Sequence, residues 1–74
     1  METRWLVEDT DCVKTMGSVL YFEQFKADGK TPMLCFDANQ AMGFETEEAG
    51  GTFMDIHFPK GWREQYAVRE HGFG

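Results

Sequence analysis

The side chains in this sequence that are best suited to metal binding are Cys12, Cys35, His57 and His71. Zinc sites that can be recognised in a sequence bring such ligands in close pairs, with two to four residues between cysteines and three to five between histidines. Neither the cysteines nor the histidines are paired in this way, so we predict no metal site and no cofactor. Two cysteines are also too few for a disulfide scaffold, and we expect reduced thiols.

Asp55 and His57 combine a carboxylate with an imidazole and could act as a base and the group that orients it. Residues two apart on a helix do not face each other, however, and no nucleophile in a supporting context accompanies them. Ser18 lacks the glycines of a nucleophile elbow, and no glycine-rich phosphate loop is present in the sequence. A ligand cavity of about 300–1,000 Å³ would also hollow out a core this small. We predict that the protein is not an enzyme.

The composition indicates a small, folded and acidic domain. The chain has 74 residues, of which 42% are hydrophobic and 15% aromatic, and 13 acidic against 7 basic residues give a net charge of −6. A disordered acidic tail would be poor in aromatics, so we expect one globular domain over residues 1–74. No apolar run approaches the roughly 18 residues of a membrane span, and the N-terminus lacks the features of a signal peptide. We therefore expect a cytoplasmic protein that does not bind membranes.

Direct binding to nucleic acid is disfavoured by the distribution of charge. Phosphate contacts need clustered Lys and Arg, whereas the basic residues here are scattered among nearly twice as many acids. Tyr21, Phe22 and Phe25 could stack on bases. A hydrophobic core needs these rings first, so we predict no direct nucleic-acid partner.

The first half of the chain predicts strands. Residues 5–7 have strand composition and end at an acidic cluster, which we expect in a turn. Residues 19–25 are rich in β-branched and aromatic side chains, and residues 33–36 can return antiparallel to them. The Asp-Gly pair at Asp28 and Gly29 is typical of a tight hairpin turn between two such strands.

The second half of the chain is ambiguous at one point. Thr46 can cap a helix that has acidic residues in its first turn and that Pro59 would end, although the same stretch, at residues 52–58, also alternates as a strand does. The double glycine of Gly50 and Gly51 counts against the helix, at about 1 kcal/mol each. We favour the helix because the cap, the acids and the proline agree, and we expect a closing strand over 63–70. The predicted fold is α+β, a small antiparallel sheet of three to four strands with one helix packed on it, in the order β-β-β-α-β.

The surplus acid is the feature most suggestive of function. Carboxylates at helix starts and in turns can serve stability and solubility alone. They can also form a negative surface that docks on a basic groove, with apolar anchors such as Met42, Trp62 or Phe73 at its centre, although each of these could cap the core instead. The candidate partner-binding residues are Glu8, Asp9, Asp11, Glu45, Glu47, Glu48, Asp55 and Trp62.

The C-terminal part of the chain resembles small phage and prophage α+β proteins. The resemblance covers roughly 30 residues. It rests on Phe44-x-Thr46-Glu47-Glu48-Ala49, Gly61-Trp62, Tyr66-x-Val68 and Glu70-His71-Gly72-Phe73. In size and charge, though not in a shared motif, the chain is also similar to anti-CRISPR inhibitors.

These observations favour a non-enzymatic inhibitor of anti-CRISPR type, which would occupy the basic nucleic-acid-binding surface of a host nucleoprotein such as a CRISPR effector. It would act as a monomer or homodimer in the host cytoplasm. The alternative is a small accessory subunit of a phage or bacterial assembly, which would oligomerise through an open sheet edge or an apolar patch. Salt should weaken the steered binding of the inhibitor to its basic partner but not an apolar oligomer.

Overall fold

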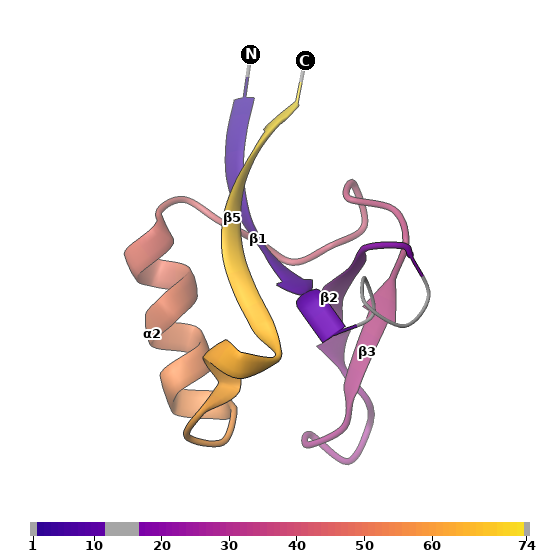
Figure 1. The fold of residues 1–74 in the computed structure, drawn as a ribbon, viewed down its shortest axis with the longest axis vertical. Coiled ribbons are helices and arrows are strands. Elements are labelled where there is room, and N and C mark those ends of the chain that lie inside the picture. Colours follow the sequence, from indigo (N-terminus) through magenta and orange to yellow (C-terminus); the bar gives the residue numbers. More distant parts are fainter. Residues whose placement is uncertain (1, 12–16, 74) are drawn as a thin grey trace.

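The computed structural model of the protein describes residues 2–11 and 17–73 and confirms the α+β class (Figure 1). A five-stranded antiparallel sheet carries one helix on it, in the order β-β-β-β-α-β. The elements are β1 (Glu2–Asp9), β2 (Leu20–Phe25), β3 (Pro32–Cys35), β4 (Gly43–Phe44), α2 (Glu47–His57), the 3-10 helix η1 (Trp62–Glu64) and β5 (Tyr66–Phe73). The sequence did not predict the two-residue strand β4 or η1. No helix among the described residues has the length and apolar character needed to cross a membrane.

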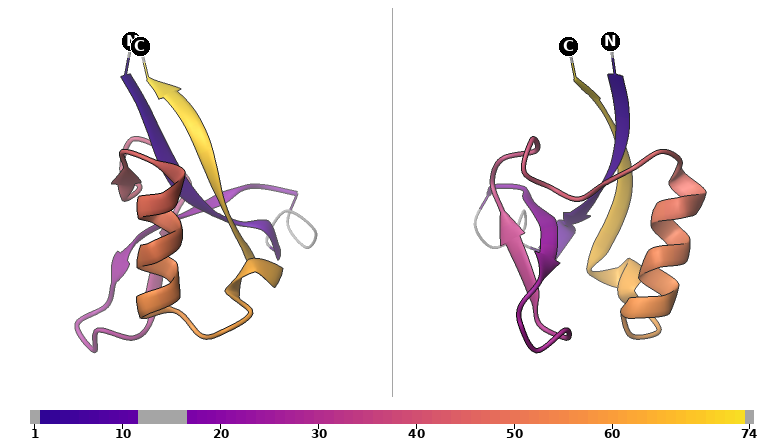
Figure 2. Two further views of the ribbon diagram at one scale, coloured as in Figure 1. Left: turned by 90° about the vertical axis from the view of Figure 1, so that its left-hand side faces the viewer. Right: turned by 180° about the vertical axis from the view of Figure 1, so that it is seen from behind.

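Strand β1 lies at the centre of the sheet. One of its edges pairs with β5 over its whole length, and β2 and β4 share the other edge. This pairing extends β1 through Glu8 and Asp9, so the prediction that these two acids lie in a turn after the first strand is wrong. The ends of β1 and β5 nearest the termini run together beyond the helix and the hairpin (Figures 1 and 2).

The predicted hairpin is confirmed, with β2 and β3 antiparallel. Its turn closes through Lys26 N, which donates to Thr31 O at 2.8 Å, and Gly29 has a φ of 71°, the left-handed conformation that the Asp-Gly pair indicated. An irregularity in register between Phe22 and Gln24 brings the rings of Phe22 and Phe25 within 5.0 Å of each other. Both rings thereby reach the core side of the sheet.

The predicted helix is confirmed as α2, and the alternative strand over 52–58 is wrong. Thr46 Oγ1 accepts a hydrogen bond from Ala49 N at 3.0 Å, and Glu47 and Glu48 follow in the first turn. The double glycine does not break the helix, and at Gly50 the backbone of α2 packs closely against β4 and β5. A Cβ at this position would lie only 2.9 Å from Val68 Cγ1.

The core lies between α2 and the sheet. Its centre is a cluster of buried side chains, namely Val7, Phe22, Met54, Trp62 and Tyr66. Phe25, Phe44, Phe53 and Phe58 are partly buried against it. The Trp62 indole is only 6% exposed, so it belongs to the interior and does not project as an anchor for a partner.

Candidate functional site

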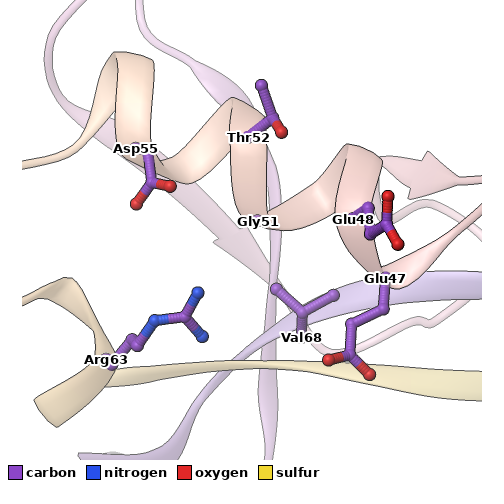
Figure 3. Close-up of a pocket in the computed structure, with 7 residues that line it drawn as sticks. All are labelled: Glu47, Glu48, Gly51, Thr52, Asp55, Arg63 and Val68. Carbon is purple, nitrogen blue, oxygen red and sulfur yellow. The ribbon is translucent and has the colours of Figure 1, made fainter.

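A groove between α2, η1 and β5 is the candidate binding site, and we call it the α2–β5 groove (Figure 3). Its volume is about 330 Å³. The lining residues are Glu47, Glu48, Gly51, Thr52, Asp55, Arg63 and Val68. Residues four apart on a helix share a face, so Glu47, Gly51 and Asp55 form one stripe of α2 above the strand. Val68 rises from β5 below them, as Figure 3 shows.

The buried Trp62 contacts two of the residues that line this groove, Asp55 and Arg63. Its indole Nε1 donates a hydrogen bond to Asp55 Oδ1 at 2.9 Å, which ties η1 to the last turns of α2. The guanidinium of Arg63 lies 4.3 Å from the centre of the same ring, a cation–π distance. A buried tryptophan therefore holds both a carboxylate and a cation at the rim of the groove.

The groove carries excess negative charge. Three carboxylates, those of Glu47, Glu48 and Asp55, line it against the single guanidinium of Arg63. The ion pairs that form among residues 2–11 and 17–73 involve other side chains. The three groove carboxylates and Arg63 therefore have no ionic partner within these residues. The arrangement can receive cationic groups without first breaking an internal salt bridge.

The predicted acidic residues therefore do not form one surface. Glu47, Glu48 and Asp55 converge on the groove, whereas Glu45, exposed and outside its lining, precedes the cap of α2. Asp9 is buried at 4% exposure, and its Oδ1 accepts a hydrogen bond from Asp11 N at 3.0 Å. Burial removes Asp9 from any docking surface.

Glu8 points away from the groove. Its neighbour Val7 packs in the core with Met54 of α2, and successive strand residues face opposite sides, so Glu8 lies on the other face of the sheet. There Glu8 Oε2 lies 2.7 Å from His71 Nε2, and Oε1 lies 3.6 Å from Arg69 Nε. Glu8 thus already contacts the His71 ring and the guanidinium of Arg69 within the chain itself.

Tyr21 and Cys35 lie near this second cluster but are not activated. The Tyr21 ring meets His71 edge-on, with centroids 5.4 Å apart, and burial, followed by the charge of Glu8, raises the pKa of the Tyr21 hydroxyl. Burial, followed by the charge of Glu23, also raises the pKa of the free Cys35 thiol. A raised pKa keeps a thiol protonated, which is unfavourable for a nucleophile. Cys12 lies outside the described residues.

The remaining proposed anchors lie away from the groove. Met42 is partly buried against the core, and the Arg4 guanidinium lies 5.2 Å from the centre of the Phe73 ring. The exposed large apolar side chains among the described residues are Phe36 and Ile56, at 67% and 71%. Neither of them lines the groove.

The lining residues that the sequence did not predict are Gly51, Thr52, Arg63 and Val68. A signal was available only for the helix, where Glu47, Gly51 and Asp55 recur at a spacing of four. Arg63 and Val68 enter the groove through η1 and the register of β5, which local patterns do not reveal.

Among the described residues, no group of three or more His, Cys, Asp or Glu side chains is placed to hold a metal ion. The polar groups of the groove can bind charged ligands. No family model, no curated protein and no solved structure matches this chain.

Proposed function

We propose that the protein is a non-enzymatic, acidic binding protein that inhibits a host nucleoprotein by occupying its basic nucleic-acid-binding surface. The observation that carries the proposal is the convergence of Glu47, Glu48 and Asp55 on one groove, where they have no internal ionic partner among the described residues. A CRISPR effector is the partner to test first, because the size and charge of the chain are similar to those of anti-CRISPR inhibitors.

The backbone that carries the groove carboxylates is held in place, which supports binding. Two of its carboxylates lie in the first turn of a capped helix, and the third is held by the Trp62 indole. A backbone and an Asp55 side chain that are already ordered lose little conformational entropy when a partner binds, so more of the contact energy contributes to affinity.

The charge of the whole chain supports fast encounter. A net charge of −6 attracts a basic surface over distances of about 10 Å at moderate salt. The Lys and Arg residues that the protein covers are then unavailable to nucleic-acid phosphates, whose binding depends on the same residues. Inhibition by occupancy needs no reacting group.

The test is displacement of nucleic acid from a CRISPR effector loaded with its guide RNA. Binding of labelled target DNA is followed by fluorescence anisotropy as the protein is added, at about 50 mM and about 200 mM salt. We expect DNA binding to be lost at low salt, with clearly weaker inhibition at the higher salt. Poly-glutamate of matched total charge is the control, and it should inhibit much less. Undiminished DNA binding at saturating protein, or equal inhibition by poly-glutamate, contradicts the proposal.

A second candidate function is that of an oligomerising accessory subunit. It is favoured by the free edge of β5, which pairs with β1 and with no other strand in the described parts of the chain, and by the exposed Ile56. Sedimentation separates the two functions. A stable oligomer that persists or tightens at high salt favours the subunit, whereas a monomer that binds its partner only at low salt favours the inhibitor.

A further inference from the structure

We infer that the α2–β5 groove binds an extended basic segment of the partner, which adds as a further strand to the free edge of β5. This inference rests on the proposed function and specifies how the partner is held. It combines the free main-chain edge of β5 with the acidic wall of α2 beside it. Strand addition of this kind obtains affinity from main-chain hydrogen bonds and specificity from alternate side chains.

The hydrogen-bond pattern shows which residues of β5 face the free edge. Beyond the end of the β1–β5 ladder, Thr10 N donates to Gln65 O at 2.8 Å, so Thr10 and Gln65 form a hydrogen-bonded pair. Such pairs alternate along an antiparallel ladder, and the register continues without a break from Asp9–Tyr66 to Glu2–Phe73. The main-chain groups of residues 68, 70 and 72 consequently point away from β1, toward the free edge.

The same residues carry their side chains toward α2. Tyr66 belongs to the core cluster and Val68 packs against it, so this set of alternating residues lies on the helix side of the sheet. A strand residue paired with Val68 would have its side chain beside that of Val68, on the same face. Figure 3 shows Val68 on the side of β5 that faces α2 and the carboxylates of Glu47 and Asp55, so the neighbouring side chain would face the same carboxylates.

The spacing of the acids fits a strand. Glu47 and Asp55 are separated by about 12 Å along the helix axis, at 1.5 Å per residue. Five residues of strand place their first, third and fifth side chains on one face over about 13 Å. The groove therefore fits a segment with a basic residue at every second position, because the intervening side chains point to the other face.

Charge decides between the possible occupants of this edge. A second copy that paired antiparallel through β5 about a twofold axis would place its own α2 on the same face. The two sets of groove carboxylates would then face each other, in a protein whose net charge is −6. A nucleic-acid strand would bring further negative charge. A basic peptide brings the opposite charge, and its main chain satisfies the free edge.

The experiment uses the intact protein and synthetic peptides of about seven residues, in which lysine alternates with threonine, followed by fluorescence anisotropy. A peptide of the same composition with its lysines adjacent is the first control. Two N-methylated forms of the alternating peptide, one on the lysine amides and one on the threonine amides, provide the second. Both keep the charge, but in a strand only one set of amides faces β5.

We expect the alternating peptide to bind about three- to tenfold more tightly than the block peptide. One N-methylated form should lose about tenfold or more in affinity and the other should bind like the parent. Equal effects of the two methylation patterns, equal binding of the two lysine arrangements, or a peptide-independent dimer through β5 would overturn strand addition. If the peptides do not show these differences while the protein still displaces DNA from the effector, strand addition is refuted and the proposed function is not. If the peptides follow the pattern but no effector is inhibited, the groove stands and the proposed function falls.

Discussion

Alanine at Gly50 and alanine at Gly51 are the same chemical change at adjacent positions of α2, and they should affect stability in opposite directions. In a helix, alanine is favoured over glycine by about 1 kcal/mol. At Gly51 the added Cβ would meet Arg63 Nη2 at 3.7 Å, an ordinary contact. Gly51→Ala should therefore raise the free energy of unfolding by about 0.5–1 kcal/mol.

At Gly50 the same gain is opposed by a clash. The added Cβ would lie 2.9 Å from Val68 Cγ1 and 3.3 Å from Phe44 Cδ2. Val68 is β-branched, so its methyl group cannot swing away freely, and overpacking of this kind costs about 1–3 kcal/mol. We expect Gly50→Ala to lower the free energy of unfolding by about 0–2 kcal/mol, and to be about 1–3 kcal/mol less stable than Gly51→Ala.

Urea unfolding, followed by circular dichroism and tryptophan fluorescence, measures both variants against the wild type. In a domain of this size, a change of 1 kcal/mol also shifts the melting temperature by about 4–8 °C, so the two variants should separate clearly on heating. If Gly50→Ala proves as stable as Gly51→Ala, α2 does not lie against Val68. Val68 would then not form the floor of the α2–β5 groove.

Three further predictions concern single interactions. Thr46→Ala removes the oxygen that caps Ala49 N and should cost about 1 kcal/mol in urea unfolding, whereas Thr46→Ser should cost much less. Hydrogen bonds from the Thr31 side chain and main chain, then from the Lys30 main chain, lower the pKa of Asp28 to about 2. The stability they add is therefore present above the usual Asp pKa of about 4 and is lost as pH falls toward 2, and an NMR titration of Thr31→Val should show the Asp28 pKa moving back up. Met54→Ala, in the buried core, should lower the free energy of unfolding by about 2–5 kcal/mol. Ile56→Ala, at an exposed position, should change it by less than about 0.5 kcal/mol.

The elements that the sequence predicted are those whose signals are local. The Asp28–Gly29 pair specifies its turn through φ preference and side-chain hydrogen bonds, and the Thr46 cap with its acidic first turn specifies where α2 begins. Both features act within four residues of the chain. Gly50 counted against the helix in the sequence, because glycine lowers helix stability. The close approach to Val68, which requires a glycine at this position, could not be seen in the sequence.

The features that escaped prediction depend on partners distant in sequence. Glu8 and Asp9 have loop-like composition, but pairing with β5 draws them into β1, and burial and the His71 contact then remove them from the acidic surface. Trp62 follows a Pro-Lys-Gly turn, and only the tertiary fold shows that its ring belongs to the core. The acidic stripe of α2 was predicted as part of the site, but its separation from the N-terminal acids required the topology.

In the proposed complex, the carboxylates of the α2–β5 groove, and not the net charge alone, bind the basic partner. Two triple variants that each remove three negative charges test it by their affinity for the effector at low salt. The groove variant is Glu47→Gln, Glu48→Gln and Asp55→Asn, and the control variant, outside the groove, is Glu2→Gln, Glu23→Gln and Asp37→Asn. Both variants have the same net charge, so long-range steering falls equally in the two.

Dissociation constants are measured by calorimetry, and circular dichroism checks that both variants are folded. Each exposed charge contact is worth about 0.2–1 kcal/mol, so the loss of three should weaken binding by roughly tenfold relative to the control variant. We expect the groove variant to bind about tenfold more weakly than the control variant. Equal affinities of the two variants would mean that the groove carboxylates do not contact the partner.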